Sequence, residues 1–97
     1  MTFMFAVTEP AAREHAFEAV SGLRREGVGA TMDLGGRSLK GQMKQADRID
    51  ATWAVIIGPD EWSRKAAALR DMRGQEQEDV PLDSLRAELL RRAEASR

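Results

Sequence analysis

Continuous apolar segments recur along the first part of the chain. They occupy residues 3–7, before a Thr-Glu-Pro turn, and residues 53–57, within the sequence TWAVIIG. A third segment, GATMDL at residues 29–34, runs into a pair of glycines. Short apolar segments bounded by turn residues are typical of buried strands. We therefore predict three strands here, and the strand within TWAVIIG is expected to be covered on both faces.

Helical spacing separates these strands. Five apolar residues at intervals of four, three, one and three share one face of a helix. They are Ala12, Ala16, Ala19, Val20 and Leu23. Pro10 suits the first turn of this helix, and Gly27 suits the left-handed position that closes it. A second helix is predicted after the cap residue Ser38, with Leu39, Met43 and Ala46 as its apolar stripe.

Strands that alternate with helices over short connections predict right-handed crossovers and a parallel sheet. The pattern changes after Gly58, where AAALRDM and EQEDVPL predict two short antiparallel strands around a turn at Gly74. Asp83 is expected to cap a last helix that carries Leu85, Leu89, Leu90 and Ala93. The whole chain, residues 1–97, is therefore expected to form one compact α/β domain.

Composition narrows the classes of function. The 97 residues include no cysteine and one histidine, which excludes disulfides, thiolate metal sites and histidine-rich metal sites. The net charge of −1 arises from 15 basic and 16 acidic residues, so RNA binding requires a local patch. The first apolar run is too short for a signal segment or a membrane span, so we expect a cytoplasmic protein with no membrane partner.

Two segments follow the carboxyl ends of the predicted parallel strands, where doubly wound sheets bind ligands. The first is GGRS, residues 35–38, and the second is GPDEW, residues 58–62. Lys40, Lys44 and Arg48 recur every fourth residue and add donors on one helical face. The alternatives are a solvated helix face for the basic residues and a plain strand-to-helix turn for the glycines.

The second segment and the strand after it offer further polar candidates. The carboxylate of Glu61 can accept hydrogen bonds from amino groups of a base, or it is simply an acid at a helix start. Trp62 can stack on a base or pack on the core. Arg70 is expected to point outward over the same end of the sheet, or else to pair with Asp71 or Glu61.

No arrangement of residues predicts catalysis. We find no Ser/His/Asp pattern, no tuned carboxylate pair and no metal-ligand spacing, and His15 is expected to be a surface histidine. A small α/β enzyme or nucleotide-binding protein fits the fold pattern but not the residues. The chain is therefore expected to be a binding module.

Taken in order, GLRREGV, DLGGRSLKGQMKQADRIDATWAVIIG, DEW and LRDMRGQEQEDVPLDSL resemble the C-terminal anticodon-binding domain of histidyl-tRNA synthetases, a class II family. The resemblance covers nearly the whole chain, and the ordered set is more specific than any of its pieces. It implies a three-layer α/β domain with a mixed five-stranded sheet flanked by helices. It also implies that the ligand is the anticodon stem-loop of histidine tRNA, and that ATP and magnesium bind in a catalytic domain absent from this chain, with no cofactor here.

The resemblance also implies which residues meet RNA. They are Gly36, Arg37, Ser38, Lys40 and Gln42 around the first segment, Lys44 as a phosphate contact, and Glu61 and Arg70 farther along. The chain departs from the family pattern at two places. Lys65 stands where the family commonly has glycine, and the glycine of the RGQEQ turn comes one place earlier than usual.

Two origins fit this resemblance. We expect the chain to be a domain excised from a longer, homodimeric synthetase and monomeric by itself. The alternative is a free-standing or regulatory paralogue that acts through protein–protein contacts.

Overall fold

The computed structural model describes residues 1–33 and 38–96, and its five strands form one mixed sheet in the order β2-β1-β3-β4-β5. The strands are β1 (Thr2–Val7), β2 (Gly29–Met32), β3 (Trp53–Ile57), β4 (Ala66–Asp71) and β5 (Gln77–Pro81). The helices are α1 (Arg13–Arg25), α2 (Leu39–Arg48), α3 (Pro59–Ser63) and α4 (Leu85–Ala95), with 3₁₀ turns η1 (Pro10–Ala12) and η2 (Leu82–Ser84). The predicted elements are thus confirmed in order and type.

The pairing of the strands also agrees with the prediction. β1 is parallel to both β2 and β3, whereas β4 is antiparallel to β3 and β5 is antiparallel to β4. The two antiparallel strands extend the sheet on the β3 side. β2 and β5 are therefore its two edges.

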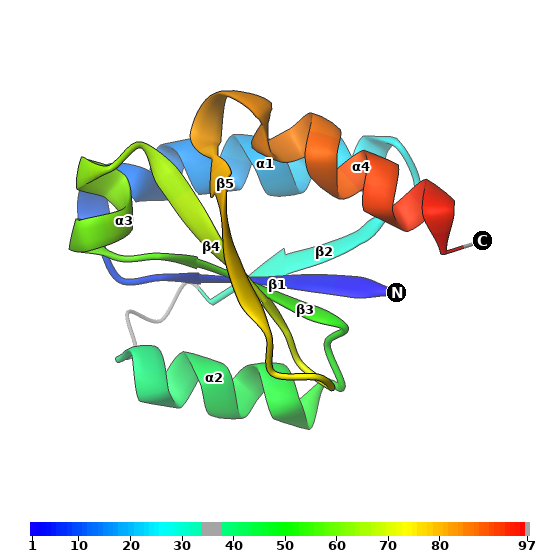
Figure 1. The fold of residues 1–97 in the computed structure, drawn as a ribbon, viewed down its shortest axis with the longest axis horizontal. Coiled ribbons are helices and arrows are strands. Elements are labelled where there is room, and N and C mark those ends of the chain that lie inside the picture. Colours follow the sequence, from blue (N-terminus) through cyan, green and yellow to red (C-terminus); the bar gives the residue numbers. More distant parts are fainter. Residues whose placement is uncertain (34–37, 97) are drawn as a thin grey trace.

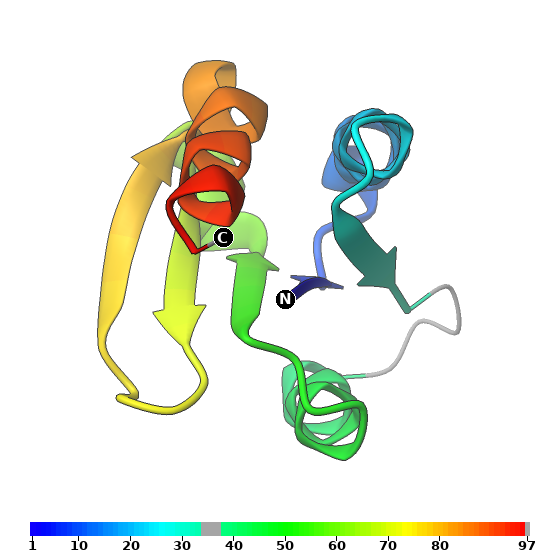
Figure 2. The same cartoon turned by 90° about the vertical axis from the view of Figure 1, so that its right-hand side faces the viewer.

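Helices cover both faces of the sheet and make three layers. Figures 1 and 2 show α1 and α4 together on one face and α2 on the other. The larger core lies under α1 and α4, where Phe3, Phe5 and the five predicted stripe residues are buried, four of them in α1 and Ala12 at the end of η1. Because successive residues of a strand face opposite sides, Met4 and Ala6 pack on the α2 face instead.

The buried stripe of α2 differs from the predicted one. Leu39 is 41% exposed, whereas Gln42 is only 1% exposed and lies with Ala46 against the sheet. Gln42 hydrogen-bonds the backbone of Val7, so its amide fixes the rotation of the helix about its axis. Met43 and Ala46 of the predicted stripe still pack on the sheet, so the prediction is wrong only for Leu39.

The last helix begins later than predicted. Asp83 lies inside η2, and Ser84 is the residue before α4, with no side-chain hydrogen bond to cap it. Leu82 and Leu85 are both buried. The 3₁₀ turn is compatible with the burial of both, because its i, i+3 positions lie on one side.

Four described residues have left-handed backbone. Gly27 has φ 79°, as predicted, and the others are Asp50 (56°), Lys65 (58°) and Gln75 (60°). Residues with a Cβ are strained in this region and glycine is not. The family glycine that Lys65 replaces thus has a physical explanation. The left-handed residue of the next turn is Gln75, directly after Gly74. A glycine one place later, as in the usual family pattern, would occupy this position without strain.

No helix within residues 1–33 and 38–96 combines the length and the apolar character needed to cross a membrane.

Candidate functional site

The carboxyl ends of β1 and β3 lie side by side and carry the candidate site. Val7 and Ile57 are paired in register, and Thr8 N donates to Ile57 O at 3.1 Å. Figure 1 shows the start of α2 and the whole of α3 at this end of the sheet. Of the predicted site residues, Gly36 and Arg37 lie outside the described residues.

The first turn of α2 is capped as predicted. The Ser38 Oγ accepts a hydrogen bond from Gly41 N at 3.2 Å. Lys40 and Lys44 are exposed on this helix, and neither forms a hydrogen bond or an ion pair with any residue in the described ranges. Their charges are therefore accessible to a ligand. Arg48, in the same row, donates to Gln45 Oε1 at 3.2 Å.

Gln42 does not lie at the surface, contrary to its expected contact with RNA. Its Nε2 donates to Val7 O at 2.9 Å, and its Oε1 accepts from Val7 N at 2.9 Å. A buried amide that meets a backbone donor and acceptor at once satisfies two polar groups of the strand. Its observed contacts thus join α2 to β1.

Glu61 caps the start of α3. Its Oε1 accepts from Gly58 N at 2.8 Å, while its Oε2 lies 3.9 Å from Arg64 Nη2. A Cβ at residue 58 would lie 2.8 Å from that Oε1, so a larger residue there would push the carboxylate out of this position. The helix-start interpretation is therefore confirmed for one carboxylate oxygen. The side chain keeps 19% of its surface exposed.

Arg64 ties α3 to the edge strand β5. Its guanidinium bonds the Asp60 carboxylate within α3 and both oxygens of Asp79 at 3.2 Å. One cation is thus shared by two carboxylates near Glu61. This charge pairing links the end of α3 to β5.

The aromatic residue of α3, Trp62, packs inward. Trp62 is half-buried against the main core, and its ring meets His15 edge to face, with 6.0 Å between ring centroids. His15 is accordingly half-buried, not a fully exposed surface histidine. The packing interpretation of Trp62 is confirmed.

Arg70 lies at the opposite end of the sheet from Glu61, which corrects the expectation that both reach over the same end. It pairs in register with Ala54, near the start of β3, because β4 runs back antiparallel from α3. It makes no hydrogen bond or ion pair with any described residue, so the pairing with Asp71 or Glu61 is not observed. Alternation along β4 places it with Ala68 on the α2 face of the sheet.

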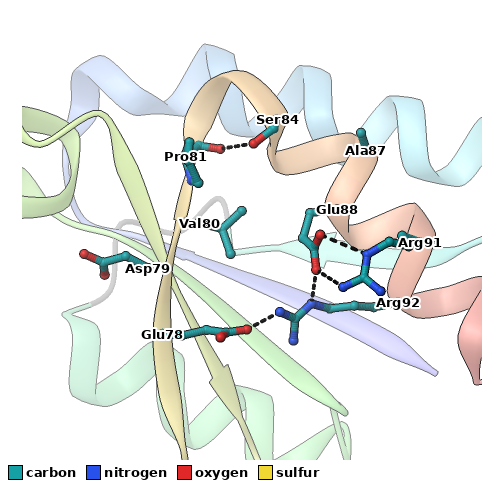
Figure 3. A pocket seen from close by; sticks show the side chains of 9 residues that line it. All are labelled: Glu78, Asp79, Val80, Pro81, Ser84, Ala87, Glu88, Arg91 and Arg92. Carbon is teal, nitrogen blue, oxygen red and sulfur yellow. Dashed lines mark hydrogen bonds and ion pairs between the residues drawn. The ribbon is translucent and has the colours of Figure 1, made fainter.

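A second charged region, which sequence reasoning missed, is a groove of about 410 Å³ between β5 and α4. Figure 3 shows Glu88 bonded to Arg91 and Arg92, and Arg92 also bonded to Glu78. Arg92 additionally lies over the ring of Trp53, 5.0 Å from its centroid. The spacing of Glu88, Arg91 and Arg92 by three and four residues is the sequence signal that reveals this cluster.

The arginines of the groove lower the pKa of Glu88. Hydrogen bonds from Arg91 and then Arg92 lower the pKa of Glu88 from 4.5 to about 2. Within the described part of the chain, the groove included, no group of three or more His, Cys, Asp or Glu residues is arranged to hold a metal ion. The charges of the groove thus pair with one another.

Comparison with known proteins agrees with this geometry. Residues 3–92 match the family model of the anticodon binding domain. The chain belongs to the anticodon-binding domain family. Among the curated relatives of this anticodon-binding domain, histidine–tRNA ligase of Desulforamulus reducens is 46% identical over 70 residues, which are 72% of this chain and 17% of the relative. The chain thus spans about a fifth of the length of the curated relatives it matches.

Solved structures give the same result. An apo histidyl-tRNA synthetase of S. aureus matches 91% of this anticodon-binding domain and 26% of its own chain, with a TM-score of 0.82 and 31% identity. The RNA binding domain of threonyl-tRNA synthetase from Cryptosporidium parvum has a TM-score of 0.73 over 91% of this chain and 22% of its own, at 19% identity. The second likeness shows the shared fold alone.

Proposed function

We propose that this domain binds the anticodon stem-loop of histidine tRNA as the C-terminal module of a histidine–tRNA ligase. The names of the similar proteins support the choice of tRNA. The observation that carries the proposal is on α2, where Lys40 and Lys44 are exposed and unpaired among the described residues. Such cations attract phosphates locally, although the net charge of the chain, −1, does not favour binding to RNA.

The residues take different roles in this proposal. Lys40 and Lys44 contact phosphates, together with Arg37 and Gly36, which precede them in the sequence, and Ser38 keeps the helix start in place. Phosphate contacts supply affinity without a choice of base. Gln42 acts from inside the domain.

Base contacts come from two separate places. The Oε2 of Glu61 accepts from an amino group of an anticodon base, while its Oε1 stays bonded to Gly58. Arg70 provides a second contact on the α2 face of the sheet, at the other end. An RNA loop that meets α2 and both residues therefore reaches from the carboxyl end of β3 to the opposite end of the sheet.

The remaining features of the proposal concern the parent protein. ATP and magnesium bind outside this chain, and the parent is a cytoplasmic homodimer, whereas the isolated domain is a monomer. A free-standing regulatory role is not favoured, since the curated relatives cited above are histidine–tRNA ligases.

The test is a titration of this chain with a histidine-tRNA anticodon stem-loop and with a loop of scrambled anticodon, at two salt concentrations. We expect preference for the native loop at both concentrations, because base contacts depend less on salt than phosphate contacts do. Equal binding of the two loops, or binding that disappears at the higher salt, would contradict recognition of the anticodon.

A further inference from the structure

The end of β1 is bordered by a helix on the side where β2 has stopped. β2 pairs with β1 only as far as Phe5, whereas β3 follows β1 to Val7. On the β3 side, Thr8 N bonds Ile57 O. On the other side, the backbone of Val7 is buried and needs partners, because buried backbone donors and acceptors are nearly always paired.

The side chain of Gln42 supplies both partners. Val7 N donates to Oε1, and Nε2 donates to Val7 O, each at 2.9 Å. A single amide group thus takes the place that the backbone of a neighbouring strand would occupy. With 1% exposure, it is shielded from water that would compete for these bonds.

This amide clamp belongs to the same helical turn as the proposed RNA contacts. Gln42 N donates to Ser38 O at 2.9 Å in an ordinary backbone bond of the helix, so the residue that carries the clamp lies one turn from the cap residue. The other inward side chains of α2, Ala46 and Met43, make apolar contacts. Apolar contacts have no direction, whereas two hydrogen bonds fix both distance and angle. Among the contacts of α2 with the described strands, those of Gln42 therefore constrain the position of the helix on the sheet most directly.

We propose that Gln42 is a positioning residue of the RNA site, which holds Lys40 and Lys44 in place by clamping α2 to the carboxyl end of β1. This inference rests on the function proposed above for that surface. Gln42 touches no RNA and acts through Val7. The clamp needs a group that both donates and accepts, which an amide does and a carboxylate of the same shape does not.

The Gln42→Glu variant tests the clamp with a change of almost no volume. At about pH 8 its carboxylate cannot donate to Val7 O, and we expect stem-loop affinity to fall about tenfold or more. On acidification the carboxyl group regains a proton at a pH above its usual range, because burial raises its pKa. It then donates and accepts again, and affinity recovers toward that of the wild type measured at the same pH.

Two further variants separate the clamp from charge and from packing. Gln45→Glu adds the same charge to the same helix but leaves the bonds to Val7 in place, so any effect of its charge should be lost only near the ordinary pKa of a glutamate. Gln42→Met fills a similar volume without either hydrogen bond, and its affinity should be low at every pH. Circular dichroism at each pH establishes which variants are folded. If Gln42→Glu is unfolded at the higher pH, the Gln42→Met variant decides.

Hydrogen exchange at the Val7 amide, measured relative to the wild type, reports the clamp without RNA. We expect faster exchange in Gln42→Glu at the higher pH and recovery on acidification. Wild-type affinity in Gln42→Met, or in folded Gln42→Glu at the higher pH, would overturn the positioning role. The role would also be overturned if acidification restored the hydrogen-exchange rate of the Val7 amide in Gln42→Glu while its affinity for the stem-loop stayed low. If the wild type itself does not bind the stem-loop, the proposed function fails, and the positioning role fails with it.

Discussion

Two charged regions of this domain differ in whether their charges are already paired. On α2, Lys40 and Lys44 are exposed and bond no described residue. In the groove between β5 and α4, Glu88 and Arg92 are bonded to each other and to further charged groups. An anion that meets α2 displaces only water, whereas in the groove it must break protein contacts. The accessibility of charges, more than their number, distinguishes a binding surface from a structural one.

The largest effect is expected from Arg92→Ala in the groove. The change removes bonds to Glu78 and Glu88 and the contact with Trp53, so we expect a loss of about 1–2 kcal/mol in the free energy of unfolding. Stem-loop affinity should remain that of the wild type. Chemical denaturation and the RNA titration measure the two quantities. Weaker RNA binding in a folded variant would show that the groove takes part in recognition.

The opposite result is expected on α2. In the double variant Lys40→Ala and Lys44→Ala, the dependence of log affinity on log salt should become shallower by about two, roughly one for each phosphate contact. Stability should change by less than about 0.5 kcal/mol, because exposed and unpaired side chains contribute little. An unchanged salt dependence would remove this helix from the RNA surface.

The Lys65→Gly variant tests whether an exposed lysine outside α2 contributes to RNA affinity. Lys65 is exposed like Lys40, but its backbone has φ 58°. Glycine relieves that strain, and we expect the free energy of unfolding to rise by about 0.5–1 kcal/mol after the entropy cost of glycine is included. RNA affinity should not change. Thermal unfolding at fixed salt measures the gain, and a loss of stability would contradict the strain argument.

The smallest effect concerns acid. The folded-state pKa of Glu88 is about 2, below its ordinary value of 4.5, so its ion pairs stabilise the domain above pH 4.5 and stop doing so as the pH falls toward 2. The stability difference between the wild type and Glu88→Gln should therefore shrink over this interval. Denaturation curves at several pH values measure it. A difference independent of pH would mean that the carboxylate charge adds nothing.

Much of this architecture could be predicted from the sequence because it depends on local patterns. The apolar spacing of α1 predicted its buried face, and the serine at position 38 predicted the N-cap of α2. Gln42 could not be predicted in the same way, because its partner Val7 lies 35 residues away on a strand. Periodicity counts an amide as polar and assigns it to the surface.

The candidate site was predicted only in part for a similar reason. Its position at the carboxyl ends of the parallel strands follows from topology, and Glu61 and Lys40 lie on elements that begin there. Arg70 lies elsewhere, because the direction of β4 decides which end of the sheet it reaches. The pairing of some charges depends on neighbours that are distant in sequence, as with Arg64 and Asp79.

The most direct test of the central claim is to follow the backbone amide NMR signals of this chain as the anticodon stem-loop is added. We predict that the largest shifts occur in the first two turns of α2, with further shifts near Glu61 and Arg70. Residues of the β5–α4 groove should remain unchanged. Shifts centred on Glu88 and Arg92, with α2 unaffected, would contradict the assignment of α2 as the binding surface.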